Sequence, residues 1–249
     1  MFKNKSKLYE LCRPNYPYSL ILFLKENKLL NRDDLIAEIG SGTGKLTGLL
    51  LGNGNCVYGV EKDEEMQFFL ANKFHSNTNF VIVKESAEDT KLPNDKFDLI
   101  VSAQSFHLFN PIRAKEEFLR IIKPNGKMAF IWYHWNTNEE VTQKIQRLFY
   151  IFREKQNQKE RSQIGLEFFI NLFYPNNVHY NVIDTIQQKF SKNDFLNSML
   201  SSSYAPLPND KLFEDYLEEV EKIFSHYAKS GYIEYSFNLV IYYLNLKRQ

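Results

Sequence analysis

Short apolar segments alternate with amphipathic stretches in the first half of the chain, and this alternation constrains the fold more than any other feature. Helices are predicted over residues 44–51, from Asp63 to Phe74, and over residues 111–122. Strands that alternate with helices at this spacing form βαβ units, which predict a parallel sheet with helices on both faces. The predicted strands cover residues 35–39, 56–60, 80–83, 97–102 and 127–133.

The alternation weakens after Tyr133, where helices are predicted over residues 138–153 and 210–229 and strands over residues 182–190 and 232–246. We therefore expect one Rossmann-like α/β domain over residues 1–249, with a seven-stranded, mostly parallel sheet flanked by helices. Its parts are an N-terminal helical segment (1–30), the core (31–135, 178–190 and 232–249) and helical additions over the binding edge of the sheet (136–177 and 191–231). The alternative is that these additions are ordinary layers of the core.

Charge balance and cysteine content limit the class of partner and the compartment. The chain has 31 Lys and Arg against 30 Asp and Glu, so no global charge signals nucleic acid or an anionic membrane. Two cysteines, Cys12 and Cys56, fit a reducing compartment, and Cys56 is expected to be buried at the start of a strand. No signal segment, membrane-spanning stretch or zinc-ligand spacing is visible, so we expect a cytoplasmic protein.

Glycines are concentrated directly after the first predicted strand, in the segment Gly40–Gly44. Glycine lets the backbone approach a ligand closely and turn tightly into the following helix. A dinucleotide fingerprint would need a glycine at Lys45, and a Walker loop would need a glycine at Ile39 and a Ser or Thr at Leu46. Both phosphate-binding interpretations therefore fit poorly.

A carboxylate follows the second predicted strand. Glu61 lies about twenty residues beyond the glycines, where a carboxylate can accept hydrogen bonds from both hydroxyls of a ribose. An isolated acid after a strand is more often a solvated loop charge. The glycine loop at this distance favours the ribose role.

Together these segments resemble the class I S-adenosylmethionine-dependent methyltransferases. Residues 38–44 resemble the first motif of that family, and Glu61 matches its ribose-binding acid. The segment 86–88 (Ser-Ala-Glu) resembles the Asp-Ala-Glu element that borders adenine, with serine in place of the acid. Residues 92–100 and 119–126 are similar to the segments that precede the fourth and fifth strands of the family. The resemblance covers about residues 13–133 well and the rest of the chain loosely.

Two further segments, 13–17 (Arg-Pro-Asn-Tyr-Pro) and 104–107 (Gln-Ser-Phe-His), are similar to the small-molecule branch that includes trans-aconitate methyltransferases. The resemblance implies S-adenosyl-L-methionine as the cofactor and S-adenosyl-L-homocysteine as the product. It implies that the glycine loop holds the methionine end, Glu61 the ribose and Gln104 the region of the sulfonium. The cofactor-binding residues implied in this way are Tyr16, Glu38, Gly40, Ser41, Gly42, Gly44, Glu61, Lys62, Met66, Ser86, Ala87, Glu88 and Gln104.

Methyl transfer is an in-line displacement at an activated carbon, so a protein mainly has to orient the acceptor and exclude water. His107 is the candidate base for acceptors that must lose a proton, and the alternative is a helix-start histidine that only packs. Residues 132–135 (Trp-Tyr-His-Trp) either line the acceptor pocket or form a half-buried strand end. Met66 packs near adenine or in the core.

These features predict methyl transfer to a small-molecule acceptor by a monomer or homodimer, without a nucleic-acid or membrane partner. No RNA-binding module is visible, and no cysteine lies near the fourth strand for attack on a pyrimidine. Three alternatives stay open. They are an RNA or protein methyltransferase, a non-catalytic S-adenosylmethionine-binding protein, and a nicotinamide oxidoreductase, which the glycine spacing disfavours.

Overall fold

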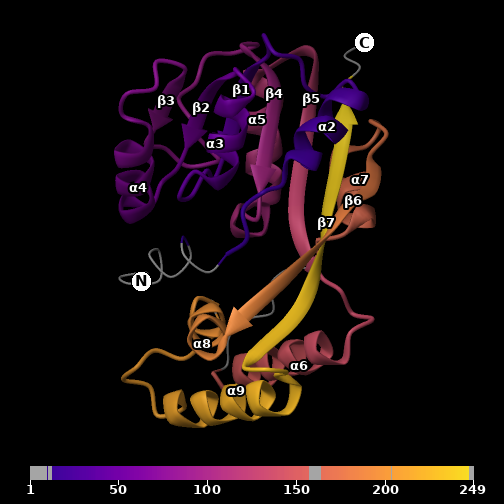
Figure 1. Cartoon of the computed structure of the whole chain (residues 1–249). Helices are drawn as coiled ribbons and strands as arrows, with labels where there is room; N and C mark the ends of the chain where they lie inside the picture. The colour runs from indigo at the N-terminus through magenta and orange to yellow at the C-terminus, as the bar shows by residue number, and fades with distance from the viewer. Residues whose placement is uncertain (1–9, 11–12, 157–163, 203, 247–249) are drawn as a thin grey trace. The chain divides into compact units, whose positions relative to one another are not determined.

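The structure, a computed structural model, describes residue 10 and residues 13–156, 164–202 and 204–246. None of the helices in this part of the chain combines the length and apolarity that a membrane span requires. The elements run in the order α2 (Tyr18–Glu26), β1 (Leu35–Ile39), α3 (Lys45–Gly52), β2 (Cys56–Val60), α4 (Glu64–Phe74), β3 (Phe80–Val83), β4 (Phe97–Ala103), the 3-10 helix η1 (Phe106–Leu108), α5 (Pro111–Ile121), β5 (Ile122–Trp135), α6 (Glu140–Lys155), α7 (Leu166–Phe173), β6 (His179–Ser191), α8 (Lys192–Leu200), α9 (Phe213–Tyr227) and β7 (Tyr232–Asn245) (Figure 1).

The strands form one seven-stranded sheet in the order β3-β2-β1-β4-β5-β7-β6. Strand β1 is parallel to β2 and β4, β2 is parallel to β3, and β4 is parallel to β5. The arrows of β6 and β7 point in opposite directions (Figure 1). The predicted α/β fold with a mostly parallel sheet is therefore confirmed. The strand order reverses between β1 and β4, which makes their carboxyl ends the expected ligand-binding edge.

The residues divide into two compact units. The first, named here the sheet unit, contains residues 15–133, 164–184 and 239–246. The second, the helical unit, contains residues 134–156, 185–202 and 204–238, with residues 10, 13 and 14. Strands β5, β6 and β7 continue from one unit into the other. The single domain expected from the sequence stays a prediction.

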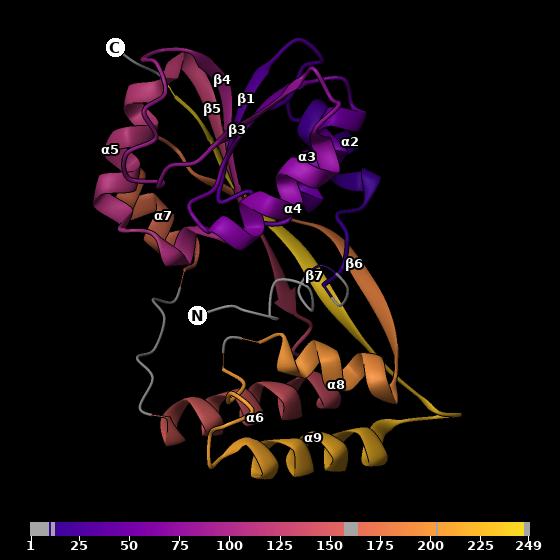
Figure 2. The same ribbon diagram turned by 90° about the vertical axis from the view of Figure 1, so that its left-hand side faces the viewer.

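The sheet unit has a hydrophobic core on each face of its strands, as Figure 2 shows for α2 and α3 on one side and α5 and α7 on the other. Successive strand residues point to opposite faces. In β5, Met128 and Phe130 therefore join the core under α5 and α7, whereas Ala129 and Ile131 join the core under α2 and α3. This two-sided burial explains why the parallel strands are continuous apolar runs.

Local signals fix where the helices begin. Asp63 caps α4 by accepting a hydrogen bond from the amide of Met66 at 3.1 Å, as the sequence predicts. Asn110 caps α5 in the same way through the amide of Arg113, and Pro111 occupies the first helical position. These caps fix the first turn of each helix, which follows β2 for α4 and η1 for α5.

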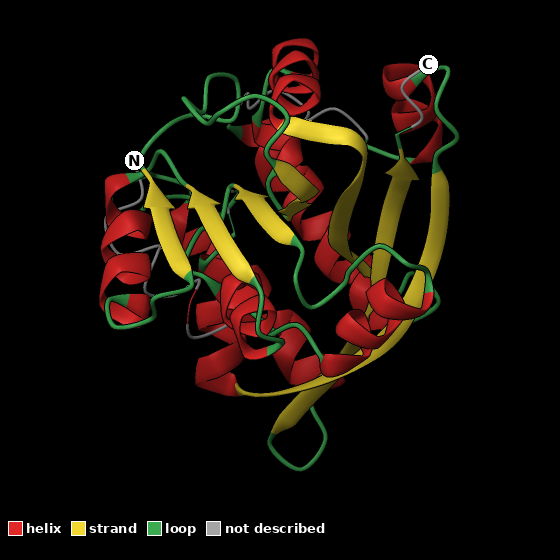
Figure 3. Ribbon diagram, turned by 90° about the horizontal axis from the view of Figure 1, so that it is seen from above, coloured by secondary structure: helices red, strands yellow, loops and turns green. Residues whose placement is uncertain are grey.

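The helical unit contains α6, α8 and α9 together with the ends of the three shared strands. Aromatic rings hold its parts together: the ring centroid of Trp135 lies 4.6 Å from that of Phe237 and 5.4 Å from that of Tyr235. The rings of Phe152 and Tyr216 meet edge-on, with centroids 5.0 Å apart, and join α6 to α9. Helices of both units are red in Figure 3.

Several element bounds differ from the predictions. Strand β5 begins at Ile122 and includes residues 124–126, where a turn was expected, and helices α7 and α8 were predicted only as parts of the helical additions. Cys56 is exposed, not buried, because it begins β2 ahead of the first buried position at Val57. Residues 1–9, 11 and 12 of the predicted N-terminal helical segment, Cys12 among them, lie outside the described residues.

Candidate active site

The glycine loop leaves β1 with a backbone that only glycine adopts readily. Gly40, Gly42 and Gly44 have φ angles of 73°, 58° and 80°. The amides of Gly40 and Ser41 donate to the carbonyl of Val60 at 2.9 and 3.1 Å. The loop is therefore fixed to the carboxyl end of β2, beside the expected ligand-binding edge.

Each of the three glycines faces different surroundings. A Cβ added at Gly40 would lie 2.5 Å from Oγ of Ser105, and one at Gly44 would lie 2.5 Å from the ring of Phe74. A Cβ at Gly42 would meet nothing within 4 Å. Gly40 and Gly44 are thus needed for packing, and Gly42 leaves backbone open to a ligand.

Glu61 lies directly beside this open position. Its Oε2 accepts a hydrogen bond from the amide of Gly42 at 2.9 Å, and its Oε1 accepts one from the amide of Asp63 at 2.9 Å. Burial raises the pKa of Glu61, and the two amide hydrogen bonds oppose that rise. The structure therefore brings the predicted ribose acid and the predicted glycine loop together.

Glu38, at the end of β1, is almost fully buried. Its Oε2 accepts a hydrogen bond from the hydroxyl of Thr47 at 2.5 Å. Burial raises its pKa from 4.5 to about 8, the Thr47 hydrogen bond lowers it, and the nearby charge of Glu61 adds to the rise. A carboxyl group with such a pKa takes up or releases a proton near neutral pH.

The segment 86–88 makes a tight turn after β3. Ser86 and Asp89 form an isolated bridge, and Ala87 between them is buried. Oε1 of Glu88 accepts a hydrogen bond from the amide of Asn110 at 2.8 Å and so ties this turn to the start of α5. Glu88 therefore has a positioning contact that the sequence did not indicate.

A second set of hydrogen bonds joins the loop between β3 and β4 to α5. Thr90 is fully buried, and its amide and hydroxyl donate to Oε1 of Glu117 on α5 at 2.8 and 2.5 Å. Arg120 donates to both oxygens of Glu117 and to the carbonyl of Leu92. Sequence reasoning missed this cluster, because its partners are about 27 residues apart.

The carboxyl end of β4 holds a strained residue. Gln104 has a φ of 58° although it is not a glycine, and its amide donates to the carbonyl of Ile131 at 2.9 Å. The hydroxyl of Ser105 donates to the carbonyl of Ile39 at 3.0 Å and lies 2.9 Å from the hydroxyl of Ser102. Ser105, which the sequence did not single out, thus joins the ends of β4 and β1 beside the glycine loop.

The candidate base, His107, and the next histidine in the sequence, His134, lie in different units. His107 lies half-buried on η1, three residues after Gln104. His134 belongs to the helical unit, and burial lowers its pKa. The structure places His107 on the same edge of the sheet unit as the glycine loop.

The N-terminal turn is attached at this edge. The ring of Tyr16 stacks on that of Tyr133 at 5.3 Å, and the Tyr133 hydroxyl donates to the carbonyl of Asn15 at 2.8 Å. Nζ of Lys45, the first residue of α3, donates to the side chain of Asn15 at 3.0 Å. Tyr16 therefore lies next to the end of β5 and the start of α3.

The remaining candidates are less closely held. Lys62 is exposed, and Met66 is half-buried in the first turn of α4. Trp132 is buried in the core of the sheet unit, which supports the strand-end interpretation for this member of the 132–135 segment.

These features fit an amino-acid nucleoside such as S-adenosylmethionine. The backbone at Gly42 is open, and the hydroxyl of Thr43 is buried without a hydrogen-bond partner among the described residues. Two carboxyl groups, on Glu38 and Glu61, lie at the ends of neighbouring strands, where their oxygens can accept hydrogen bonds from an ammonium group and from ribose hydroxyls. Among the described residues, no group of three His, Cys, Asp or Glu side chains is placed to hold a metal ion.

Comparisons with known proteins agree with this geometry. Residues 37–130 match the family described as Methyltransferase domain. An uncharacterized methyltransferase-like protein of Schizosaccharomyces pombe is similar to this chain, with 31% identity over 148 residues, 59% of this chain and 56% of that protein. The chain thus spans about half the length of the curated relatives that it matches.

Solved structures resemble the chain over most of its length. A candidate type II methyltransferase from Anaeromyxobacter dehalogenans gives a TM-score of 0.67 at 19% identity, covering 94% of this chain and 97% of that one. The phosphoethanolamine N-methyltransferase 2 of Haemonchus contortus, in complex with phosphomonomethylethanolamine and S-adenosylhomocysteine, gives a TM-score of 0.60 at 14% identity, covering 100% of this chain and 58% of that one. At these identities the likeness establishes the fold. Over residues 37–130 the chain is therefore similar to the methyltransferase domain family, and its fold is that of the solved methyltransferase structures.

Proposed function

We propose that the chain transfers the methyl group of S-adenosylmethionine to a small-molecule acceptor. The observation that carries the proposal is the 2.9 Å hydrogen bond from the amide of Gly42 to Glu61, at a position where the backbone faces open space. It joins a ribose acid and a glycine loop at the switch point of the sheet. The family match over residues 37–130 supports the same reaction.

The residues around this hydrogen bond divide the binding task. We assign the methionine end to Glu38 and the glycine loop, the ribose to Glu61, the adenine to residues 86–88, and the sulfonium region to Gln104. Bound S-adenosylmethionine supplies a methyl group that is already activated for displacement. The contacts proposed for the cofactor are those of Tyr16, Glu38, Gly40, Ser41, Gly42, Gly44, Glu61, Lys62, Met66, Ser86, Ala87, Glu88 and Gln104.

The protein itself then has to orient the acceptor, exclude water and accept a proton where the acceptor must lose one. His107 is the proposed proton acceptor, because it is a half-buried imidazole on the binding edge. Gln104 and Ser105 hold the start of η1 in place through the carbonyls of Ile131 and Ile39. The position of His107 therefore depends on both neighbouring strands.

A small acceptor is favoured by three features. The chain is close to neutral overall, which does not favour a polyanionic substrate. The segments 13–17 and 104–107 are similar to the small-molecule branch that includes trans-aconitate methyltransferases. The Haemonchus contortus neighbour carries a small phosphorylated amine with S-adenosylhomocysteine.

Cofactor binding is tested first, by thermal shift and calorimetric titration with S-adenosylmethionine, S-adenosylhomocysteine and NAD. A ligand at a hundred times its dissociation constant stabilises the folded state by about 2.7 kcal/mol. We expect both adenosyl ligands to stabilise the protein and NAD to leave it unchanged. Stabilisation by NAD alone would contradict the proposal.

Substitution of the ribose acid shows whether binding uses this site. Glu61→Gln should weaken the affinity for S-adenosylhomocysteine about tenfold or more, because a charged acceptor is replaced by a neutral amide. The matched control is Glu64→Gln, an exposed position in the first turn of α4, which should bind as the parent chain does. If both variants bound S-adenosylhomocysteine equally well, Glu61 would not be a binding residue.

Turnover is tested by the release of S-adenosylhomocysteine from a panel of acceptors: small carboxylic acids that include trans-aconitate, small amines, total RNA and an unfolded protein. We expect release with a member of the first two groups. Release only with RNA or protein would replace the small-molecule assignment, and binding without any turnover would favour a non-catalytic protein. His107→Gln separates the two roles of that residue, because loss of a base lowers kcat whereas loss of packing lowers stability.

A further inference from the structure

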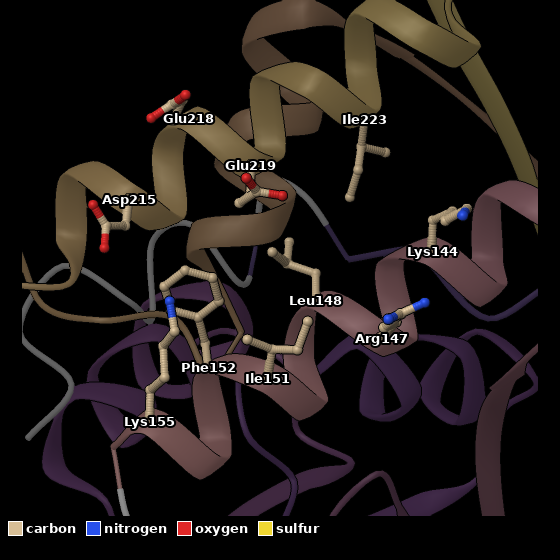
Figure 4. Close-up of a pocket in the computed structure, with 10 residues that line it drawn as sticks. All are labelled: Lys144, Arg147, Leu148, Ile151, Phe152, Lys155, Asp215, Glu218, Glu219 and Ile223. Carbon is tan, nitrogen blue, oxygen red and sulfur yellow. The ribbon is translucent and has the colours of Figure 1, made fainter.

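A groove runs between α6 and α9 in the helical unit, and none of its lining residues is assigned to cofactor binding. It has a volume of about 500 Å³. Its lining residues, drawn in Figure 4, are Lys144, Arg147, Leu148, Ile151, Phe152, Lys155, Asp215, Glu218, Glu219 and Ile223. We name it the interhelical groove.

The two helices that form the interhelical groove are antiparallel. The ring of Phe152, near the end of α6, packs against that of Tyr216, near the start of α9. At the other end, the hydroxyl of Tyr227 donates to Oε1 of Glu140 at 2.8 Å. The two contacts fix the register, so residues near the end of α6 lie beside residues near the start of α9.

Charge is separated between the two walls. The α6 wall is basic, and the α9 wall is acidic: its members are Asp215, Glu218 and Glu219. Glu218 and Glu219 bind Lys222 of their own helix, and within the described residues no salt bridge crosses the groove. On the basic wall, Lys144 and Arg147 are exposed and have no ion pair among the described residues.

The floor of the interhelical groove is apolar. Leu148 and Phe152 are buried there, Ile223 is half-buried, and Ile151 is 37% exposed. Lys155 lies 4.9 Å from the ring of Phe152, so its charge extends over an apolar surface. The groove thus combines an exposed apolar strip with opposite charges on its two sides.

We propose that a second copy of this chain occupies the interhelical groove. A surface with a basic helix beside an acidic, antiparallel helix is its own complement under a twofold axis that runs along the helices. Such an axis places α6 of one copy over α9 of the other, without reversing the direction along the helices. Lys155 then faces the partner's Asp215, and Arg147 faces the partner's Glu219. Four helices meet around Ile151 and its symmetry mate, with each α6 antiparallel to the facing α9.

The pairing predicts a dimer that depends on salt. Charged side chains supply much of this surface, and exposed charge pairs are screened as ionic strength rises. By sedimentation velocity, we expect the parent chain to form dimers at about 50 mM salt and to bind its partner at least tenfold more weakly at about 500 mM salt. A parent chain that stays monomeric at about 100 µM in low salt would overturn the proposal.

Charge reversal tests the pairing itself. We expect Arg147→Glu/Lys155→Glu, which makes both walls acidic, to be monomeric. The partner variant, Asp215→Lys/Glu219→Lys, makes both walls basic and should also be monomeric. An equimolar mixture should form a heterodimer, because each acidic wall of the first variant then faces a basic wall of the second.

Only self-complementary pairing predicts this recovery on mixing. Circular dichroism and thermal unfolding of each variant establish that it is folded, and recovery on mixing itself requires folded partners. Dimers of either single variant as strong as those of the parent chain would overturn the proposal, and so would a mixture of two folded variants that stays monomeric. The test is independent of the proposed function, since it needs neither cofactor nor acceptor.

Discussion

Gly40 and Gly42 share a left-handed backbone but differ in what surrounds them. A methyl group at Gly40 would collide with Ser105, whereas one at Gly42 would enter open space. We expect Gly40→Ala to lower the free energy of unfolding by about 3 kcal/mol, from strain and overpacking together. Gly42→Ala should cost about 1 kcal/mol and yet weaken S-adenosylhomocysteine binding at least tenfold, because the methyl group takes the place of the ligand. Urea denaturation and calorimetric titration measure the two effects.

Gly52 provides the control for both substitutions. It is the last residue of α3, and a Cβ there would meet nothing within 4 Å. Gly52→Ala should therefore leave both stability and binding close to those of the parent chain. If Gly42→Ala also bound the ligand normally, the loop would not be the cofactor site.

Glu38 makes the stability of the fold depend on pH. Burial raises its pKa from 4.5 to about 8, so the folded chain keeps a proton that the unfolded chain loses. The stabilisation linked to this proton is complete below about pH 4.5 and is lost as the pH rises to about 8.

Glu38→Gln cannot ionise and removes this dependence. Relative to the parent chain, the variant should gain a few kcal/mol of unfolding free energy between about pH 5 and about pH 9. Urea denaturation across this range measures the difference. A difference that does not change with pH would show that Glu38 is ionised in the folded protein throughout.

At the residue scale, the sequence predicted the contacts that follow from residue type and from spacing along the chain. The glycine loop and Glu61 lie about twenty residues apart on neighbouring strands, and the structure joins them by a hydrogen bond. The contacts of Ser105 with Ile39 and of Thr90 with Glu117 were not predicted. A serine or threonine has no sequence signal for a partner on another element, so only the packed fold identifies it.

Helix α5 is tied to the loop before β4 by Glu117. This buried carboxylate accepts hydrogen bonds from Thr90 and Arg120. Burial pushes its pKa up, but the hydrogen bonds from Arg120 and Thr90 outweigh burial and hold the pKa below its usual value. We expect Glu117→Gln to cost about 1–3 kcal/mol at neutral pH, because its partners lose a charged acceptor.

The pH dependence of this tie is opposite to that of Glu38. A lowered pKa in the folded state means that the stabilisation is present above about pH 4.5 and is lost as the pH falls through the folded-state pKa. Urea denaturation near pH 7 and near pH 4 should therefore show a smaller cost of Glu117→Gln in acid. The exposed neighbour on α5, Glu116, gives the control: Glu116→Gln should be nearly neutral at both. Equal losses of unfolding free energy in the two variants would contradict a stabilising role for the hydrogen bonds of Glu117.

At the element scale, the ends of a strand or helix were predicted well where the element is a buried apolar run. Strands β1, β2 and β3 begin and end where predicted, because each is a short apolar run. Strand β6 was predicted over residues 182–190 but starts at His179, since residues 179–181 of this edge strand are exposed and carry no apolar pattern. Helix α7, eight residues long, is too short for its period to be recognised beside apolar neighbours.

The two tryptophans report on the two units separately. Trp132 is buried in the sheet unit, and Trp135 packs against Phe237 in the helical unit, only three residues further along β5. Because β5, β6 and β7 all continue through both units, loss of either unit should pull apart the strands of the other. Trp132→Phe and Trp135→Phe each leave one tryptophan. In each variant we expect tryptophan fluorescence and circular dichroism to report the same urea midpoint of unfolding. Fluorescence and circular dichroism midpoints that separate within one variant would show that the units unfold independently.

The position of β7 in the sheet matters during synthesis of the chain. Strand β7 follows the other six strands of the sheet in the sequence, yet it lies inside the sheet, between β5 and the edge strand β6. A growing chain on the ribosome can pair β1 to β5 long before β7 leaves the exit tunnel. During that interval, one side of β5 presents unpaired backbone groups and the apolar residues that β7 later covers. The nascent protein therefore depends on β7, or on a chaperone in its place, to avoid joining other chains through that open edge.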